Sequence, residues 1–139
     1  MLLDIVNYGD PVLRQKGERV EQITPEITQL IDDMLETMHE AHGIGLAAQQ
    51  VGKALTLTMV DVTDVEDRPS RMSIDGEAVK PEDYMPLILL NPEWTVVGDT
   101  KEEAPEGCLS FPEVYGNINR HEEIDVMAMD EKGEAVAFR

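Results

Sequence analysis

Cys108 is the only cysteine in the chain, and it lies in the middle of the stretch Glu106-Gly107-Cys108-Leu109-Ser110. A lone cysteine is usually a small buried hydrophobe, and a single one cannot form an internal disulfide. As a thiolate, however, it would suit Fe²⁺ or Zn²⁺, and such a metal lowers the pKa of bound water and polarises a carbonyl group. The residues around Cys108 must therefore decide between a core residue and a metal ligand.

Gln50 is the second residue with useful chemistry, and it ends the small-residue stretch GIGLAAQQ that begins at Gly43. Its side-chain amide offers two donors and one acceptor, which can orient a carbonyl substrate and share the charge of an oxyanion. Glycine and alanine add no bulk, so the backbone here can pass close to another group. Taken alone, the same residues also suit tight core packing and a solvent-facing glutamine.

A catalytic metal site of this type needs three protein ligands and one open position, and the chain has three histidines, His39, His42 and His121. His39 and His42 fall near the end of a predicted helix, where we expect them to face solvent or the helix C-terminus. His121 opens the stretch His-Glu-Glu-Ile-Asp, which falls on a predicted strand. Residues four apart on a strand are about 13 Å apart, too far to share one metal. We therefore predict none of the three histidines as a metal ligand.

One amphipathic helix is predicted ahead of the first stretch. Thr24 and Pro25 form a helix start, since a threonine hydroxyl caps free N–H groups and proline at the first helical position loses no bond. Apolar residues then recur at helical spacing and form one face: Ile27, Leu30, Ile31, Met34, Leu35 and Met38. We expect the helix to end near Gly43, where glycine can take the left-handed conformation. An extended lead-in with one short helical turn is expected over residues 5–14.

The remaining elements are predicted to be strands, which makes the fold α+β and a single domain. The expected strands are Ala54 to Val62, Pro86 to Leu90, Trp94 to Val97, Glu123 to Met129 and Ala135 to Phe138. Asn91-Pro92 should divide the second from the third, and the turn at 130–133 should join the last two. Residues 64–82 are expected to form a surface loop or hairpin. We expect Cys108 at the start of a strand and residues 115–120 in a connection.

The composition excludes several classes of partner. The chain has 29 acidic and 11 basic residues and a formal charge of −18, which repels nucleic acid and anionic membrane surfaces. No apolar run approaches the roughly 20 residues that span a bilayer, and we expect no signal peptide in the first residues. We therefore expect a cytoplasmic protein that binds neither DNA nor a membrane.

Together, the stretches around Gln50 and Cys108 resemble the first two of three signature motifs of the peptide deformylase family. Residues 9–14 also resemble that family's N-terminus. The resemblance implies a metal-dependent hydrolase that removes the formyl group from the N-terminal formyl-methionine of nascent polypeptides. The expected metal is Fe²⁺, with Zn²⁺ or Ni²⁺ as alternatives. The residues implied are Gln50 and Leu109 for catalysis, with the Leu109 backbone N–H helping to hold the formyl oxygen, Cys108 as metal ligand, and Gly43, Ile44 and Gly45 for substrate binding.

The third motif of that family is His-Glu-x-x-His on a helix, which supplies two more metal ligands and the catalytic carboxylate. It does not occur in residues 1–139. We therefore expect one deformylase-like domain, truncated at its C-terminus, without that helix and with doubtful metal occupancy. The implied partners are N-formyl-methionyl peptides, with the ribosome or a chain that supplies the helix as further candidates. The alternative is a catalytically incomplete deformylase-like protein that binds peptides or another protein without turnover.

Overall fold

The computed structural model describes residues 1–139, and its one α-helix, α1 (Pro25–Glu40), begins at the predicted cap. Thr24 Oγ1 accepts a hydrogen bond from the Ile27 amide at 3.3 Å. The prediction for the helix end is wrong in detail, because His42 and not Gly43 takes the left-handed conformation, with a φ of 56°. The Gly43 amide instead donates to a carbonyl of the last helical turn at 2.9 Å. This bond closes the helix and directs the chain into the first motif.

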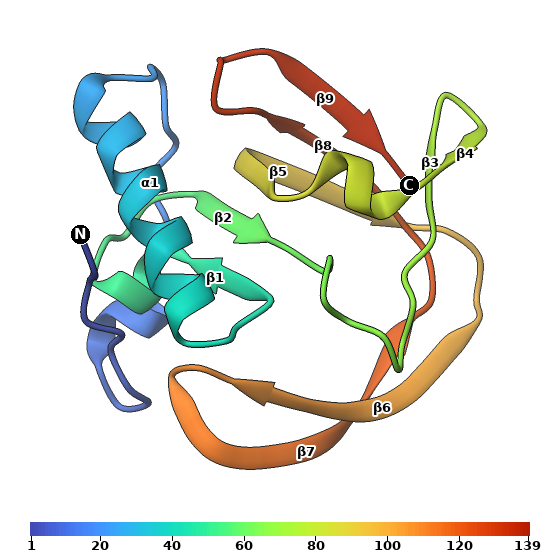
Figure 1. Cartoon of the computed structure of the whole chain (residues 1–139), viewed down its shortest axis with the longest axis horizontal. Helices are drawn as coiled ribbons and strands as arrows, with labels where there is room; N and C mark the ends of the chain where they lie inside the picture. Colours follow the sequence, from blue (N-terminus) through green and yellow to red (C-terminus); the bar gives the residue numbers. More distant parts are fainter.

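The strands form one large sheet and two hairpins, and every strand pair is antiparallel. The large sheet has the order β1-β2-β5-β8-β9. Its strands are β1 (Gly45–Ala47), β2 (Leu57–Val60), β5 (Leu87–Val96), β8 (Ile124–Met129) and β9 (Ala135–Phe138). The hairpins are β3 (Met72–Ile74) with β4 (Glu77–Val79), and β6 (Lys101–Cys108) with β7 (Phe111–His121). Figure 1 shows β6 and β7 as a long curved pair apart from the large sheet. The predicted α+β class is confirmed.

Three short 3₁₀ helices complete the fold: η1 (Pro11–Arg14), η2 (Ala48–Val51) and η3 (Pro81–Tyr84). The first is the helical turn predicted for the N-terminal lead-in, and Asp10 caps it by accepting a hydrogen bond from the Val12 amide at 3.1 Å. The second carries the end of the first motif. The third precedes β5, after the hairpin that was expected in residues 64–82.

The predicted break at Asn91-Pro92 is wrong, because β5 runs through both residues. A register shift between Leu90 and Glu93 marks a bulge, and Asn91 has a φ of 53°. The Asn91 side chain bonds both the amide and the carbonyl of Val20, each at 2.8 Å. A bulge leaves residues unpaired in the ladder, and here a side-chain amide supplies bonds at that point. Strand β5 can therefore contain a proline and still pair on both sides.

Two predictions about the second motif are also wrong. Cys108 ends β6 and does not begin a strand, and residues 115–120 lie within β7 and do not form a connection. All side chains of β7 are exposed. Because neither face of this strand is buried, its sequence lacks the apolar alternation that identifies a strand. The remaining predicted strands exist, although β2 is shorter than the run from Ala54 to Val62.

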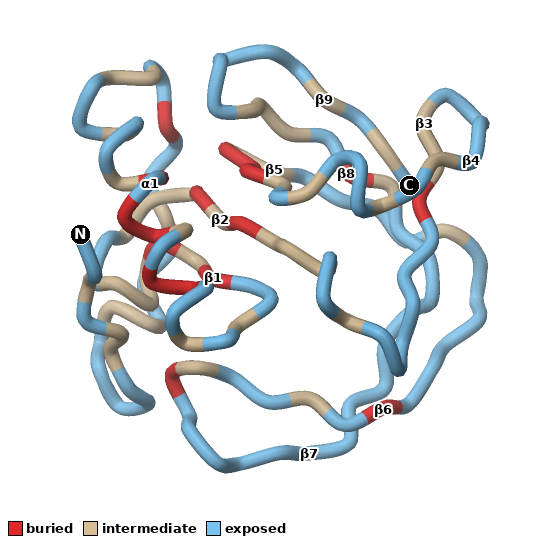
Figure 2. Tube along the Cα trace, viewed as in Figure 1, coloured by how far each residue is buried: buried red, intermediate tan, exposed pale blue.

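The core lies between α1 and the strands β1, β2 and β5. Ten buried residues form one cluster: Val20, Ile31, Met34, Met38, Leu46, Ala48, Leu57, Met59, Ile88 and Leu90. Figure 2 shows the buried positions concentrated on α1 and the strands facing it, while β6 and β7 are mostly exposed. The apolar face predicted for α1 is thus the face that packs, because burying that face stabilises the helix. None of the helices combines the length and the apolar character that a membrane span requires.

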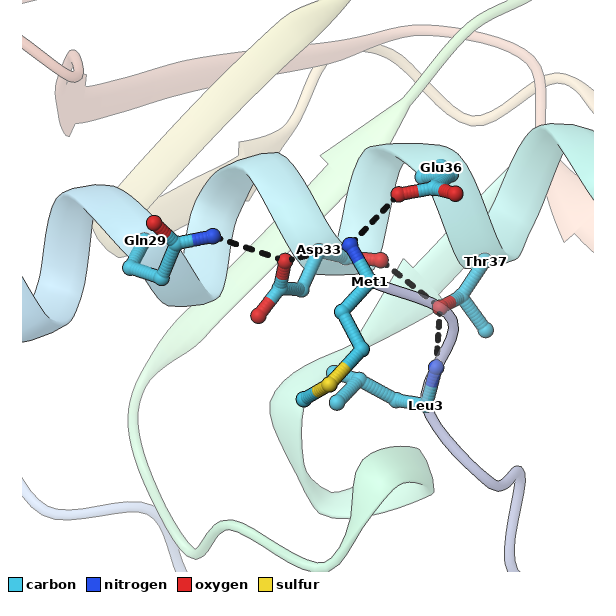
Figure 3. A network of polar contacts seen from close by, with 6 residues as sticks. All are labelled: Met1, Leu3, Gln29, Asp33, Glu36 and Thr37. Atoms are coloured by element: carbon cyan, nitrogen blue, oxygen red, sulfur yellow. Dashed lines mark hydrogen bonds and ion pairs between the residues drawn. The ribbon is translucent and has the colours of Figure 1, made fainter.

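The N-terminal segment is fastened along α1, as Figure 3 shows. The Met1 amino group lies 3.0 Å from Asp33 Oδ1 and 2.7 Å from Glu36 Oε2. The Leu3 amide donates to Thr37 Oγ1 at 2.9 Å. The hydrogen bond from the amino group, followed by one from Gln29, lowers the pKa of Asp33. These contacts place the start of the chain so that residues 6–8 reach the candidate site.

Candidate active site

The Gln50 side chain has a fixed orientation because it caps η2, the helix to which Gln50 belongs. Its Oε1 accepts a hydrogen bond from the Ala47 amide at 3.0 Å, which caps the start of η2. A backbone N–H can only donate, so Oε1 must face Ala47 and Nε2 must point the other way. Nε2 lies 3.6 Å from Cys108 Sγ and 3.1 Å from Ser110 Oγ. The donor end of the amide therefore faces the second motif.

Cys108 lies at the end of β6 with an exposed thiol. The register between β6 and β7 shifts from Gly107 to Cys108, so the hairpin is irregular where the thiol is presented. Bulges of this kind re-aim side chains and are frequent next to active sites. The shift turns Cys108 toward the Gln50 amide, which comes from a separate part of the chain.

The two motifs also contact each other through Gly43 and Leu109. A Cβ added at Gly43 would lie 2.6 Å from Leu109 Cδ1, closer than real Cβ contacts allow. The Leu109 side chain thus occupies the space that any larger residue at position 43 would need. Glycine at position 43 therefore lets the Leu109 side chain approach the backbone of the first motif closely.

The N-terminal segment joins the two motifs at the level of the backbone. The Val6 amide donates to the Gln50 carbonyl at 2.8 Å, and the Tyr8 amide donates to the Ser110 carbonyl at 2.6 Å. The Tyr8 ring also packs edge-on against Phe111, with centroids 4.9 Å apart. The N-terminal segment therefore binds the backbones of Gln50 and Ser110, which are far apart in sequence.

A cavity of about 420 Å³ lies at this junction. Its walls are Tyr8, Leu13, Ala47, Gln49, Gln50, Cys108, Ser110 and Phe111. Volumes of a few hundred Å³ are usual for pockets that bind small molecules, and such pockets have mainly apolar walls with a few oriented polar groups. The Gln50 amide, the Cys108 thiol and the Ser110 hydroxyl are the polar groups that converge here.

The predicted substrate-binding residues lie where a peptide can reach them. Ile44 is 53% exposed, and Gly45 begins β1, which is the first strand of the large sheet and pairs only with β2. The outer edge of β1 is therefore free of strand partners. An exposed edge strand can accept an extended peptide through backbone hydrogen bonds.

His39 is exposed to solvent, and its ring also contacts Asp61, which follows β2. His39 Nε2 lies 3.0 Å from Asp61 Oδ2, and the Asp61 amide donates to the Ile44 carbonyl at 2.8 Å. Burial alone would raise the pKa of Asp61, but hydrogen bonds from Thr63 and His39 outweigh it, and the pKa is lowered. The pair joins α1 to the end of β2, the strand that follows the first motif.

The donor set for a metal is incomplete within these residues. No group of three His, Cys, Asp or Glu side chains is placed to hold a metal ion. His121 pairs with Lys101 at the end of the hairpin opposite Cys108. A metal bound at Cys108 would need two further protein ligands, so the 139 residues do not by themselves fit a catalytic metal centre.

Two residues near the site were missed in the sequence. Ser110 lies in the Glu-Gly-Cys-Leu-Ser stretch. Its functional interest comes from its burial and its hydrogen bond with Gln50, and only the structure reveals these. Arg120 donates to both oxygens of Glu106 at 2.6 and 2.8 Å, and this contact lowers the pKa of Glu106. The sequence alone does not pair Arg120 with Glu106, because the two residues meet only when β6 and β7 are aligned.

The polypeptide deformylase family model matches residues 2–139. A peptide deformylase of Opitutus terrae is 43% identical over 134 residues, which are 96% of this chain and 69% of that protein. One of Endomicrobium trichonymphae is 44% identical over 122 residues, which are 88% of this chain and 62% of that protein. The chain thus spans less than two thirds of some curated relatives.

Solved structures agree with these matches. Peptide deformylase from Thermotoga maritima superposes with a TM-score of 0.81 at 32% identity, covering 99% of this chain and 80% of that one. The Synechococcus elongatus enzyme, solved in complex with actinonin, gives a TM-score of 0.79 at 38% identity, covering 97% and 63%. Both motifs, the fold and the match over nearly the whole length agree, and the chain belongs to the polypeptide deformylase family of metal-dependent hydrolases.

Proposed function

We propose that the protein removes the formyl group from N-formyl-methionyl peptides, and that these residues hold the peptide and orient the formyl carbonyl. The observation that carries this proposal is the meeting of Gln50 Nε2 and Cys108 Sγ at 3.6 Å on the wall of a cavity. The matched family acts on formylated nascent peptides. Gln50 comes from the first of the family's three motifs and Cys108 from the second.

The proposed work of this chain is binding and electrostatic stabilisation. The peptide backbone pairs with the free edge of β1 at Gly45, and Ile44 lines an apolar pocket for the methionine side chain. The Gln50 amide and the Leu109 backbone N–H donate to the formyl oxygen, where negative charge develops during attack on the carbon. Donors that are already oriented stabilise this charge without the cost of reorganising water.

Cys108 is proposed as one ligand of a divalent metal. The family's chemistry depends on such a metal, and Fe²⁺ is the proposed ion, with Zn²⁺ and Ni²⁺ as alternatives that a thiolate also suits. The remaining ligands must come from outside the residues described. We propose that residues 1–139 act as one cytoplasmic domain, and that the substrate is met on chains leaving the ribosome.

The test is hydrolysis of a formyl-methionyl peptide without oxygen, with Fe²⁺ or Ni²⁺ present. The 139-residue chain is assayed alone and with a separate helical peptide that carries a His-Glu-x-x-His sequence. Hydrolysis should require the metal and be lost in Cys108→Ala. Gln50→Ala should lower kcat by about 10²–10³-fold, the usual cost of one oxyanion donor. Hydrolysis that persists in Cys108→Ala, or no hydrolysis when the peptide is supplied, would contradict the proposal.

A second candidate is peptide binding without turnover. It is favoured by the free edge of β1 beside a cavity, in residues that lack a complete set of metal ligands. Titration of the metal-free chain with a formyl-methionyl peptide, followed by calorimetry, distinguishes the two. Binding with no hydrolysis under any metal condition would favour this candidate, and the absence of binding would remove it.

A further inference from the structure

We propose that Ser110 is a positioning residue that aims the Gln50 amide in the deformylase reaction, an inference that rests on the proposed function. Ser110 is 5% exposed, and its Oγ accepts a hydrogen bond from Gln50 Nε2 at 3.1 Å. It does not need to touch the substrate. Its role is to fix the Gln50 amide, which does contact the substrate.

The hydrogen bonds of the Gln50 amide account for its orientation completely. Oε1 accepts a hydrogen bond from the Ala47 amide at 3.0 Å. If the side-chain amide flipped, its NH₂ group would face the Ala47 N–H, and two donors cannot bond each other. One Nε2 hydrogen is then taken by Ser110. The second hydrogen is directed toward the Cys108 side of the cavity, where Sγ lies 3.6 Å away. This is the hydrogen left for a formyl oxygen.

Ser110 can hold Gln50 in place because its own backbone is fixed. Its carbonyl accepts from the Tyr8 amide at 2.6 Å, and the same segment donates to the Gln50 carbonyl from Val6 at 2.8 Å. The backbones of both partners are thus tied to one short segment. A side-chain bond between two groups that are already fixed loses little conformational freedom when it forms, so it can hold the amide in a single orientation.

Removing the hydroxyl should therefore affect the reaction more than peptide binding. Without Ser110 Oγ the Nε2 group keeps its Ala47 anchor at the other end of the amide but can rotate away from the formyl oxygen. A small displacement of a catalytic group lowers the reaction rate, so kcat should fall while KM changes little. A neutral hydrogen bond of this kind contributes modestly, and the expected loss is about 5- to 10-fold in kcat.

The experiment compares Ser110→Ala and Ser110→Thr with wild type, alone and combined with Gln50→Ala. Ser110→Ala should lower kcat by about 5- to 10-fold, and Ser110→Thr, which keeps a hydroxyl, should recover most of the loss. In the Gln50→Ala background, Ser110→Ala should change kcat less than about 2-fold, because residues acting through one contact are not additive. Ser73→Ala, a change in β3 away from the cavity, is the matched control. If Ser110→Ala does not fold, Ser110→Cys replaces it in the same comparison.

A second measurement does not depend on activity. In the metal-free chain, the two side-chain N–H resonances of Gln50 are followed by NMR. One of them should shift and lose protection from solvent exchange in Ser110→Ala but not in Ser73→Ala. If wild type hydrolyses no formyl peptide, the proposed function fails, and these resonances still decide whether Ser110 holds Gln50. The inference is overturned if the resonances do not change, or if Ser110→Ala lowers kcat equally in the presence and absence of Gln50.

Discussion

At the scale of single residues, the site depends on contacts between side chains that are distant in sequence. Leu109 fills the space beside Gly43, Gln50 reaches Ser110, and Arg120 binds Glu106. Each contact fixes part of the second motif relative to the first or to β7. The geometry at Cys108 is therefore a sum of several small constraints, and each can be tested on its own.

Gly43→Ala should damage the site more than the fold. Its Cβ would lie 2.6 Å from Leu109 Cδ1, so the Leu109 side chain must move, and we expect this movement to disturb the backbone N–H of the same residue. Overpacking of this kind costs about 1–3 kcal/mol, here at the low end because the contact is with the tip of a side chain. Urea unfolding and kcat/KM measure the two effects. Leu109→Val, which shortens the side chain, should restore part of both, and no restoration would place the damage elsewhere.

Glu106→Gln should destabilise the protein at neutral pH, and this effect should shrink as the pH falls. The Arg120 hydrogen bonds lower the pKa of Glu106 in the folded state, so the pair stabilises fully above the ordinary glutamate pKa of about 4.3. That stabilisation is lost as the pH falls through the lowered pKa, because the carboxyl becomes protonated. For this partly exposed pair we expect about 0.5–1 kcal/mol at pH 7.

The measurement is urea unfolding of wild type and Glu106→Gln at pH 7 and near pH 3. Glu103→Gln is the control, because Glu103 lies on the same strand and makes no ion pair. It should leave the free energy of unfolding unchanged at both pH values. A difference between wild type and Glu106→Gln that does not shrink in acid would mean that the Arg120 contact is not its source.

At the scale of elements, the segment before α1 does more than lead into the helix. Glu18 forms a parallel bridge with Leu55, and the Thr56 hydroxyl donates to the Gly17 carbonyl at 2.9 Å. The segment therefore continues along the chain that enters β2. Together with the bond from the Val6 amide to the Gln50 carbonyl, it holds η2 and the chain that enters β2.

Gly17→Ala should be strongly destabilising, because the added Cβ would meet backbone. It would lie 2.6 Å from the Leu55 carbonyl carbon and 2.7 Å from the Thr56 nitrogen, neither of which can rotate away. We expect a loss of about 2–3 kcal/mol, measured by urea unfolding. Gly116→Ala is the matched control, since a Cβ there meets nothing within 4 Å. Equal stability of the two variants would show that the bridge is dispensable.

At the scale of the whole molecule, the core is small and much apolar surface is exposed. Only 17 of 139 residues are buried, while Trp94 is 63% exposed and Val96 40% exposed. Trp94 and Val96 lie on one face of β5, and Ile124, which pairs with Val96, extends that face onto β8. Exposed apolar patches of this kind usually contact another surface. In the isolated chain, another molecule of the same chain is available to cover it.

The isolated chain should therefore self-associate, and more so at high salt. The charge of −18 opposes contact between copies, and salt screens that repulsion over about 10 Å at 0.1 M. Sedimentation velocity across a range of protein and salt concentrations measures the mass, and a hydrophobic dye reports the exposed patch. Trp94→Lys should reduce both association and dye binding. A monomer at all concentrations, with no dye bound, would contradict this prediction.

Local rules in the sequence determined the helix, the strands β8 and β9, and the residues of the two motifs. The cap at Thr24, the apolar spacing along α1 and the turn before Ala135 act over a few residues, so they can be read directly. Those rules could not reveal β7, the bulge at Asn91 or the contact of Ser110 with Gln50. Each depends on register between distant segments, and register is decided by which side chains and backbone groups find partners when the whole chain packs.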